Sequence, residues 1–409
     1  MGTYERYLPH PLQSAALLLK PELSLQVGEA ERSVLELGGA VARDLAGVAR
    51  SMLRSEAIAS SRIEGVAPSA RQVALAELGE FEDVPGISEQ AQLVANNMTI
   101  VQEARDRLAE AERVTVEHLV DLHRALLPGD GPHGLRTMQN WVGGSRWHPI
   151  DAEFVPPPPS LVPELMADLV AYLNGAAHSP IVQAGLVHAQ FETIHPFADG
   201  NGRVGRALIH TVLMRRGLAR HAVLPVSMVL ATRSEAYVAG LTAFRHEASA
   251  NSTASFEALS KWLTTFTEAV LIAAEQAKFL GDQLASLRTE WDEQLARARE
   301  RRGRRRSLRS GSATALILRD LPATPVLSAA TAVRLHGVSH VAVGAALEEL
   351  VDAGILQVSN ARRRRYFRSQ EVLDLVTWAE RRLASTRFDT RISQPVRPAP
   401  SAPVPEARE

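Results

Sequence analysis

The chain has 409 residues, of which 45% are hydrophobic and 22% charged, a composition typical of globular proteins and not of disordered ones. At roughly 150 residues per domain, this length predicts two or three domains. The formal net charge of −1 excludes a general attraction to nucleic acid or to anionic membranes, and the absence of cysteine excludes disulfides, thiolate metal sites and a cysteine nucleophile.

Apolar periodicity predicts a helical N-terminal region over residues 1–110, with helices over 34–64, 70–82 and 88–110. Residues 1 to about 30 lack clear periodicity, so we expect them to wrap onto a later part of the core. The chain shows neither a signal peptide nor an apolar run of about 18 residues. We therefore expect a cytoplasmic protein without a membrane span.

A second helical region is predicted over 111–290, and it contains one non-helical stretch. Its helices are predicted over 115–127, 160–174, 180–192, 201–217, 233–247 and 254–285, the last continuing toward Arg302. Residues 140–159, NWVGGSRWHPIDAEFVPPPP, combine β-favouring residues with a glycine pair and a proline run. This pattern predicts a short hairpin followed by an extended segment.

The character of the chain changes near residue 303. RARERRGRRRSLR (297–309) holds eight arginines and one glutamate, which indicates a basic linker or a helix end, and the linker is predicted over 291–310. Residues 311–386 are predicted to form a compact winged-helix-like domain, with helices over 311–320, 328–336 and 339–352 and a two-stranded wing that carries Arg362 to Arg365 and Arg368. The proline-rich tail over 387–409 is expected to be disordered.

The most informative stretch is HPFADGNGRVGR (195–206), which opens a predicted helix. Glycines at 200 and 202 allow the backbone to turn tightly and to approach a ligand closely. A helix N-terminus has free N–H groups and a partial positive charge, so it favours anions. Asn201 is a candidate N-cap whose amide can also donate to phosphate. Arg203 and Arg206 lie three residues apart, so both can bind phosphate oxygens.

Two further side chains in this stretch favour chemistry on a polyphosphate. Asp199 can hold Mg²⁺, which binds one or two carboxylates together with substrate phosphates. His195 lies four residues earlier and can act as a general base at neutral pH. Phe197, between them, is predicted to be a buried anchor for the loop. Together these residues predict a site that binds a polyphosphate with Mg²⁺ and activates an incoming hydroxyl.

The stretch 195–206 resembles the signature of the Fic family, His-x-Phe-x-Asp/Glu-Gly-Asn-Gly-Arg-x-x-Arg, at every fixed position. The resemblance implies a Fic catalytic domain over 111–290 that transfers AMP from ATP to a protein hydroxyl. It implies that His195 deprotonates the target side chain and that Asp199 binds Mg²⁺. The phosphate-binding residues that it implies are Gly200, Asn201, Gly202, Arg203 and Arg206, the two arginines holding the β- and γ-phosphates.

SSRIEG (60–65) is similar to the inhibitory motif of the same family, Ser/Thr-x-x-x-Glu-Gly/Asn, with Ser60, Glu64 and Gly65 at its fixed positions. Ser60 and Glu64 are four residues apart, so they share one face of a helix. The dipole disfavours a glutamate in the last helical turn by roughly 0.3–1 kcal/mol, which favours a cationic partner from elsewhere. The resemblance supplies Arg206 as that partner, with Glu64 displacing the γ-phosphate. An ordinary helix-end glutamate is the alternative.

Two further segments resemble parts of Fic proteins. NWVGGSRW (140–147) resembles the flap, whose exposed edge aligns the target segment by strand addition. The backbone implied to lie near the nucleotide is that of Val142, Gly143, Gly144 and Ser145, and a plain surface hairpin is the alternative. RSEAY (233–237) resembles the segment whose tyrosine lines the adenine pocket, which makes Tyr237 a candidate. The preceding residue, often aromatic in relatives, is Ala236 here.

The predicted fold is mainly α, a Fic-type helical core with a hairpin flap and a C-terminal winged-helix domain. The predicted function is a protein adenylyltransferase with ATP as co-substrate, Mg²⁺ as cofactor, a target protein along the flap, and inhibition by Glu64. Two alternatives stay open, a nucleotide-sensing DNA-binding regulator and an enzyme that removes AMP. For the C-terminal domain, contact with the Fic core, with a second subunit in a homodimer or with the target is favoured over DNA, because helix 339–352 contains no Arg, Asn or Gln to read bases.

Overall fold

The computed structural model describes residues 3–13, 17–41, 45–129, 131, 133–219, 223–303, 308–361 and 364–385. In these ranges the chain is mainly α-helical with one small sheet, as the sequence predicted. The tail over 387–409, expected to be disordered, lies outside the described residues. So do Arg362 and Arg363 of the predicted wing.

The first helices lie close to the predicted ranges. They are α1 (Pro21–Val41), α2 (Leu45–Ile63), α3 (Ala70–Gly79), α4 (Glu89–Glu103) with a π-helical continuation (Ala104–Leu108), and α5 (Val116–Leu126). Side-chain N-caps begin three of them, because Ser69, Ser88 and Thr115 each accept a hydrogen bond from a backbone N–H of the first turn.

The next helices surround the stretch that carries the predicted chemistry. They are a 3₁₀ turn (Pro159–Leu161), α6 (Val162–Asn174), α7 (Pro180–Ile194), α8 (Asn201–Arg215), α9 (Val226–Thr232), α10 (Ser234–Phe244) and α11 (Thr253–Arg301). Helix α9 was not predicted from the sequence. Its seven residues are too few to show a period, and five successive ones, from Val226 to Leu230, are buried.

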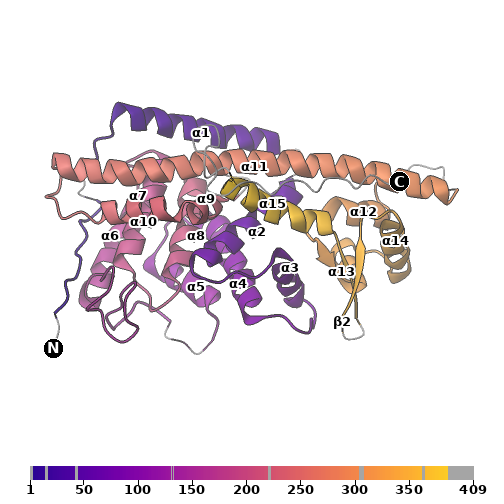
Figure 1. Cartoon of the computed structure of the whole chain (residues 1–409), viewed down its shortest axis with the longest axis horizontal. Coiled ribbons are helices and arrows are strands. Elements are labelled where there is room, and N and C mark those ends of the chain that lie inside the picture. Colours follow the sequence, from indigo (N-terminus) through magenta and orange to yellow (C-terminus); the bar gives the residue numbers. More distant parts are fainter. Residues whose placement is uncertain are drawn as a thin grey trace, which may run out of the picture.

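Helix α11 is the longest element and runs along the whole body of the molecule (Figure 1). Its 49 residues span about 74 Å at 1.5 Å per residue. Helix α1 lies along it and buries an apolar stripe with intervals of three and four residues, formed by Leu23, Val27, Ala30, Val34 and Leu37. This stripe explains why the helix begins at Pro21, earlier than the predicted residue 34.

The N-terminal region and the helices of 111–290 share one hydrophobic core. The buried residues of this core include residues of both regions, from Leu12 to Leu284, and the side chains of Phe191, Phe197 and Trp262 are fully enclosed in it. The predicted boundary near residue 110 therefore does not separate two cores. Within this core α2, which carries Ser60, packs against α8, which begins at Asn201.

The C-terminal module follows α11 and contains the sheet. Its elements are α12 (Ala313–Asp320), β1 (Val326–Leu327), α13 (Ala329–His336), α14 (His340–Asp352), β2 (Gln357–Ala361), β3 (Arg364–Arg368) and α15 (Gln370–Ser385). The strands are antiparallel in the order β1-β3-β2, with Val358 opposite Phe367. The three helices and the wing follow the order expected for a winged helix, whereas β1 and α15 were not predicted.

A continuous helix joins this module to the core, as the predicted continuation of helix 254–285 toward Arg302 expects. It corrects the basic linker predicted over 291–310 for residues 291–301. Residues 291–301 are part of α11, Trp291 and Leu295 are buried against the module, and Ala298 is also buried. Their spacing of four and three residues is an amphipathic helix pattern inside an arginine-rich stretch. Helix α15 then returns to the core, in which it buries Leu373, Val376, Ala379 and Leu383.

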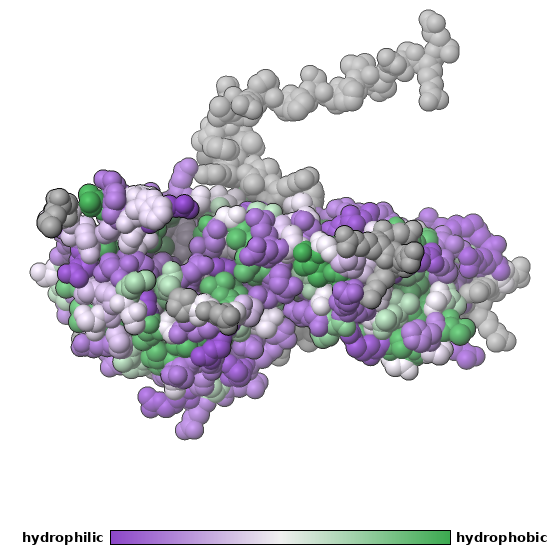
Figure 2. Space-filling view, turned by 90° about the horizontal axis from the view of Figure 1, so that it is seen from below, coloured by the Kyte–Doolittle hydropathy of each residue, from purple (hydrophilic) through white to green (hydrophobic). Residues whose placement is uncertain are grey.

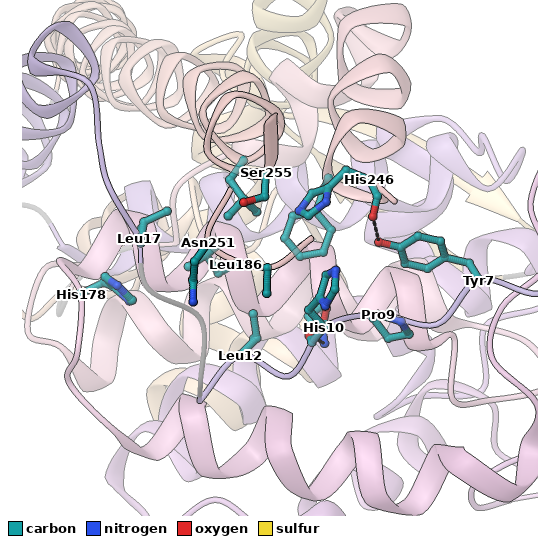
Figure 3. Close-up of a pocket in the computed structure, with 14 residues that line it drawn as sticks. Tyr7, Pro9, His10, Leu12, Leu17, His178, Leu186, His246, Asn251 and Ser255 are labelled. Carbon is teal, nitrogen blue, oxygen red and sulfur yellow. Dashed lines mark hydrogen bonds between the residues drawn. The ribbon is translucent and has the colours of Figure 1, made fainter. Parts of the chain in front are cut away.

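The extended segment 3–13 lies on the core, as expected for the first residues of the chain (Figure 3). The hydroxyl of Tyr7 donates to the carbonyl oxygen of His246 at 2.9 Å, and Nε2 of Gln190 donates to the carbonyl oxygen of His10 at 3.0 Å. The pocket beneath this segment has a volume of about 50 Å³. That volume leaves room for only about two water molecules.

The predicted hairpin over 140–159 is reduced to one antiparallel bridge between Val142 and Phe154. Gly143 and Gly144 turn the chain with φ of 74° and 70°, and a Cβ on Gly144 would overlap the carbonyl oxygen of Asp151. The proline run 156–159 follows and cannot donate to a strand ladder. The flap is therefore a glycine turn held by one bridge.

The outer surface is mixed in polarity. Figure 2 shows a face on which hydrophilic residues are interrupted by separate apolar patches. Large apolar side chains that are exposed include Met138 and Trp147 beside the flap and Val341 on α14. Across the described ranges, no helix combines the length and the apolar character that a membrane-spanning segment needs.

Candidate active site

The loop between α7 and α8 carries the predicted catalytic stretch. Helix α7 ends at Ile194, and His195 adopts a left-handed conformation with φ 51° and ψ 59°. A non-glycine residue in such a conformation costs about 1–3 kcal/mol and persists where its surroundings impose it. Helix α8 begins at Asn201, directly after Gly200 at φ 74°. Two left-handed residues therefore mark the two ends of the loop.

Asn201 fixes the conformation of this loop. Its Oδ1 accepts from the backbone N–H of Phe197 at 2.8 Å, and its Nδ2 donates to the carbonyl oxygen of Phe197 at 2.9 Å. This corrects the expectation that Asn201 caps α8, because Gly200 is the N-cap. Its amide holds the loop, and donation to phosphate by the second N–H of Nδ2 stays a prediction. Phe197 is the predicted buried anchor, and its ring stacks on His123 at 4.1 Å between centroids.

Two side chains that the sequence analysis did not single out hold the backbone of His195. Arg136 is 6% exposed, and its Nε donates to the carbonyl oxygen of His195 at 2.8 Å. Nδ2 of Asn140 donates to the carbonyl oxygens of His195 at 3.3 Å and of Phe197 at 2.9 Å. These bonds give the strained turn partners for its carbonyl groups. Asn140 also begins the flap, so the flap is tied to the loop.

The imidazole of His195 has the properties of a general base. Its Nδ1 lies 3.3 Å from the carbonyl oxygen of Glu192, so a proton on Nδ1 is donated there and Nε2 is left as an acceptor. Burial lowers the pKa of His195 to about 4, and Arg245 and Arg136 act in the same direction against that hydrogen bond. The ring is therefore neutral at pH 7 and can accept a proton.

Arg203 is a buried cation with unused donors. Its side chain is 5% exposed, and Nε and Nη1 have no hydrogen-bond partner within the described ranges. Its Nη2 lies 3.7 Å from Oδ1 of Asp199. Buried donors without partners are costly, and an oxyanion at the N-terminus of α8 would satisfy them.

Asp199 can hold a cation beside this anion site. Its carboxylate is 76% exposed, and Oδ1 accepts from the backbone N–H of Gly200 at 2.6 Å. The described part of the chain holds no cluster of three or more His, Asp or Glu that could bind a metal alone. One exposed carboxylate next to a phosphate site fits Mg²⁺, which takes few protein ligands when it binds with substrate phosphates.

Residues of the segment 60–65 meet the segment 195–206 at Arg206. Nε of Arg206 donates to Oγ of Ser60 at 2.9 Å, and Nη2 donates to the carbonyl oxygen of Ser60 at 2.9 Å. Nη2 also donates to Oε1 of Glu64 at 2.7 Å in an ion pair. A Cβ on Gly202 would overlap Oε1 of Glu64, so this carboxylate lies directly against the first turn of α8. The structure thus brings together all three side chains that the two motifs predict.

The two partners shift each other's pKa in the directions of a stable ion pair. Burial raises the pKa of Glu64, but Arg206, its hydrogen bond and Arg203 together outweigh burial and bring the pKa below its usual value. Burial opposes the charge of Arg206, and Glu64, Tyr237 and Glu192 outweigh it, so the pKa of Arg206 is raised. Both groups are charged at neutral pH.

Helix α2 is held in this position from several sides. Gly65, with φ 80°, follows Glu64 and ends the helical turn, which suits the glycine of the motif. Glu56 is fully buried, and its carboxylate accepts from the backbone N–H of Ser227 at 2.8 Å and lies 3.1 Å from Nε2 of His210. Glu56 therefore ties the middle of α2 to α8 and α9.

Tyr237 and Glu192 lie in the packed interior behind the loop. Tyr237 is buried, and its hydroxyl lies 2.9 Å from Nε2 of His188, so direct contact with adenine stays a prediction. Oε1 of Glu192 is buried with no hydrogen-bond partner in the described part of the chain. Burial raises the pKa of Glu192 to about 7 against the opposing charge of Arg206. The only indication in the sequence that Glu192 lies near the site is its position three residues before His195.

Asn140 connects the flap to the loop through its hydrogen bonds to His195 and Phe197. Trp141 Nε1 donates to the carbonyl oxygen of Ser145 at 2.7 Å, which closes the glycine turn from Val142 to Ser145. Nucleotide contacts from this backbone therefore stay a prediction.

Comparison with known proteins agrees with this geometry. Residues 113–213 match the Fic/DOC family. Among curated proteins, the chain is 33% identical over 134 residues to the protein adenylyltransferase fic-1 of Caenorhabditis briggsae, covering 31% of this chain and 24% of that protein. It is 31% identical over 170 residues to a probable protein adenylyltransferase of Aquifex aeolicus, covering 41% of this chain and 49% of that protein. The chain therefore contains a Fic domain.

A solved structure extends the likeness beyond that domain. A Fic family protein from Desulfovibrio desulfuricans G20 matches with a TM-score of 0.53 at 22% identity, over 88% of this chain and 98% of that one. This likeness shows the fold. The chain spans about a quarter to a half of the length of the two curated relatives.

Proposed function

We propose that this chain transfers AMP from ATP to a hydroxyl side chain of a protein, and that Glu64 holds the activity in check. The observation that carries the proposal is the set of groups around the N-terminus of α8. A neutral imidazole, a buried arginine with unused donors and an arginine paired with Glu64 meet there. The names of the curated relatives, protein adenylyltransferases, support the same reaction.

In this reaction His195 is the general base. Nε2 takes the proton of the incoming hydroxyl while the hydroxyl oxygen bonds to the α-phosphorus of ATP. The bond between the α-phosphorus and the bridging oxygen breaks, and pyrophosphate leaves. Arg136 and Asn140 act as positioning residues, because they bind the backbone carbonyl groups of His195 and Phe197.

The phosphates are held at the N-terminus of α8. Arg203 would donate its unused N–H groups to one of the terminal phosphates, and Arg206 would bind the γ-phosphate after it is released from Glu64. Asp199 would hold Mg²⁺, which neutralises phosphate charge and fixes the orientation of the triphosphate. Gly202 leaves room beside Arg206, because a Cβ there would overlap Oε1 of Glu64 and crowd the guanidinium of Arg206. Gly200 allows the left-handed turn before α8, where a Cβ would press on Leu126.

Inhibition follows from competition for Arg206. Glu64 uses Nη2 of this arginine at 2.7 Å, so the carboxylate and a γ-phosphate require the same donor. ATP can then bind in an orientation that does not present the α-phosphorus in line with the hydroxyl. Movement of α2 away from α8, or loss of the Glu64 carboxylate, frees the arginine.

The target protein would bind beside the flap. Met138 and Trp147 are exposed there, at 78% and 82%, and an extended target segment could pair with the backbone near the glycine turn. The C-terminal module is proposed to act on the Fic core and not on DNA. Its arginines Arg299 and Arg365 are already paired with carboxylates of α14, which reduces the positive charge available for phosphates.

The direct test is transfer of radioactive AMP. Purified full chain would be incubated with Mg²⁺ and ATP labelled at the α-phosphate, with the chain itself and a cell lysate as acceptors. Label on protein that requires His195 supports the proposal. Label released from AMP-modified protein without any transfer would instead favour the reverse reaction, in which Glu64 orients a water molecule.

A further inference from the structure

A cavity lies where α2 and α3 meet the C-terminal module, and no residue of the loop between α7 and α8 lines it. Its volume of about 300 Å³ is at the lower end of the range for small-molecule sites. Three elements supply its polar lining, with Arg50 and Arg54 from α2, Glu77 from α3, and Arg334 from α13. We call this space the junction cavity.

The junction cavity carries an excess of positive charge. Its lining contains three guanidinium groups, those of Arg50, Arg54 and Arg334, and one carboxylate, that of Glu77. Arg50 and Arg54 both pair with Glu77, at 2.8 and 2.7 Å. The side chain of Arg54 is 1% exposed, and its Nη2 donates to the carbonyl oxygen of Ala323 at 3.1 Å. Its buried Nη1 has no partner in the described part of the chain. A buried cationic donor without a partner indicates a missing acceptor.

The rest of the lining is apolar and includes one accessible aromatic ring. Phe81 is 63% exposed, and the guanidinium of Arg334 lies 4.2 Å from the centre of its ring. Leu78, Pro325 and Val326 also line the cavity. An occupant therefore meets cationic donors together with apolar and flat surfaces.

We propose that the junction cavity binds a small anionic ligand in which a carboxylate or phosphate is joined to a flat apolar group. The anion would accept from Nη1 of Arg54 and from Arg334, and the flat group would lie against Phe81 and the apolar lining. Both charge and shape support this class, because a bare anion leaves the apolar half of the cavity unfilled and an apolar molecule leaves Arg54 unpaired.

Such a ligand would act on the helix that blocks the active site. Arg54 lies on α2, and Glu64 directly follows the last residue of this helix. The ten residues between them correspond to about 15 Å at 1.5 Å per residue. Oγ of Ser51 donates to the carbonyl oxygen of Pro322 at 3.2 Å, so α2 also contacts the module directly. This link to catalysis rests on the proposed function, whereas binding at the junction cavity does not.

The test is calorimetric titration of the full chain with phenyl phosphate, benzoate and inorganic phosphate. We expect saturable binding of phenyl phosphate or benzoate, and which of the two binds more tightly identifies the anionic group. Arg334→Gln and Phe81→Ala each should weaken that binding, Arg334→Gln by about tenfold. Both side chains are exposed, so these variants should fold.

The control is Arg297→Gln, which removes an exposed arginine of α11 that pairs with Glu293 and does not line the cavity. It should leave binding unchanged. The proposal is overturned if neither organic anion binds saturably. It is also overturned if the anions bind Arg334→Gln as tightly as the wild type, because binding at the N-terminus of α8 would then explain the titration. Failure of AMP transfer in a separate assay would remove only the link to catalysis.

Discussion

Glu64→Gly is the change that most directly perturbs the proposed inhibition. Glu64 follows the last residue of α2, Ile63, so a glycine there removes the carboxylate without interrupting the helix. Arg206 keeps its two hydrogen bonds to Ser60, at 2.9 Å each, and loses only the bond to Glu64 at 2.7 Å. The substitution therefore frees Nη2 for a γ-phosphate while the arginine stays in place.

The expected size of the effect follows from that single bond. A hydrogen bond between charged groups contributes about 1.5–3 kcal/mol, and the exposure of Glu64, 35%, places this one at the lower end through solvent screening. Loss of about 1.5 kcal/mol of competition for Arg206 corresponds to about a tenfold increase in transfer rate at limiting ATP.

The assay is the initial rate of AMP incorporation from ATP, compared among wild type, Glu64→Gly and Glu64→Gln. Both variants should exceed the wild type, because both remove the charge. Glu293→Gln, which removes an exposed carboxylate of α11, is the matched control and should not change the rate. Unchanged or lost activity in Glu64→Gly, with ATP still bound, would refute this reasoning and favour the reverse reaction or a structural role for Glu64.

Four further outcomes are expected. His195→Ala should abolish transfer and leave ATP affinity nearly unchanged in calorimetry, because the imidazole acts on the hydroxyl; transfer near the wild-type rate would remove its assignment as base. Asp199→Ala should lose Mg²⁺-dependent transfer, and full activity in a Mg²⁺ titration would contradict the metal assignment. Because the pKa of His195 is lowered to about 4, the imidazole stays unprotonated and kcat/KM should hold almost level from pH 7.5 to 5, whereas a base with the usual pKa of 6.5 would retain only about 3% at pH 5. Fluorescence anisotropy should show weak, salt-sensitive DNA binding by the full chain, because arginines of the wing and of α11 already pair with α14, and tight sequence-selective binding at physiological salt would restore the regulator interpretation.

Most helices were predictable because each buries an apolar face whose period is visible over ten or more residues. The exceptions have identifiable physical causes. Helix α9 is short and buried over five successive residues, so it shows no apolar period. The stripe of α1 from Leu23 to Leu37 follows a proline-containing segment, which favoured an irregular structure there. The arginines of 297–309 indicated a linker, whereas Trp291 and Leu295, shortly before them on α11, form a buried helix face. In this helix the charged residues of the exposed face outnumber the apolar residues of the buried face, so the apolar period is weak in the sequence.

The contacts of the candidate site were predictable where they join side chains of the two motifs, and less so where a side chain binds the backbone. The sequence brought out Ser60, Glu64 and Arg206, and the structure joins them by hydrogen bonds. It could not indicate Arg136, because a residue that binds carbonyl groups across the fold has no local pattern. Nor could it indicate that the amide of Asn201 holds the loop through both backbone groups of Phe197.

The central claim is AMP transfer by His195 under the control of Glu64, and tandem mass spectrometry tests it most directly. The full-chain variants Glu64→Gly and Glu64→Gly with His195→Ala would each be incubated with ATP, Mg²⁺ and a cell lysate. The account predicts AMP esterified to hydroxyl side chains with the first variant and none with the second. AMP-modified residues at equal levels in both samples, or in neither, would contradict it.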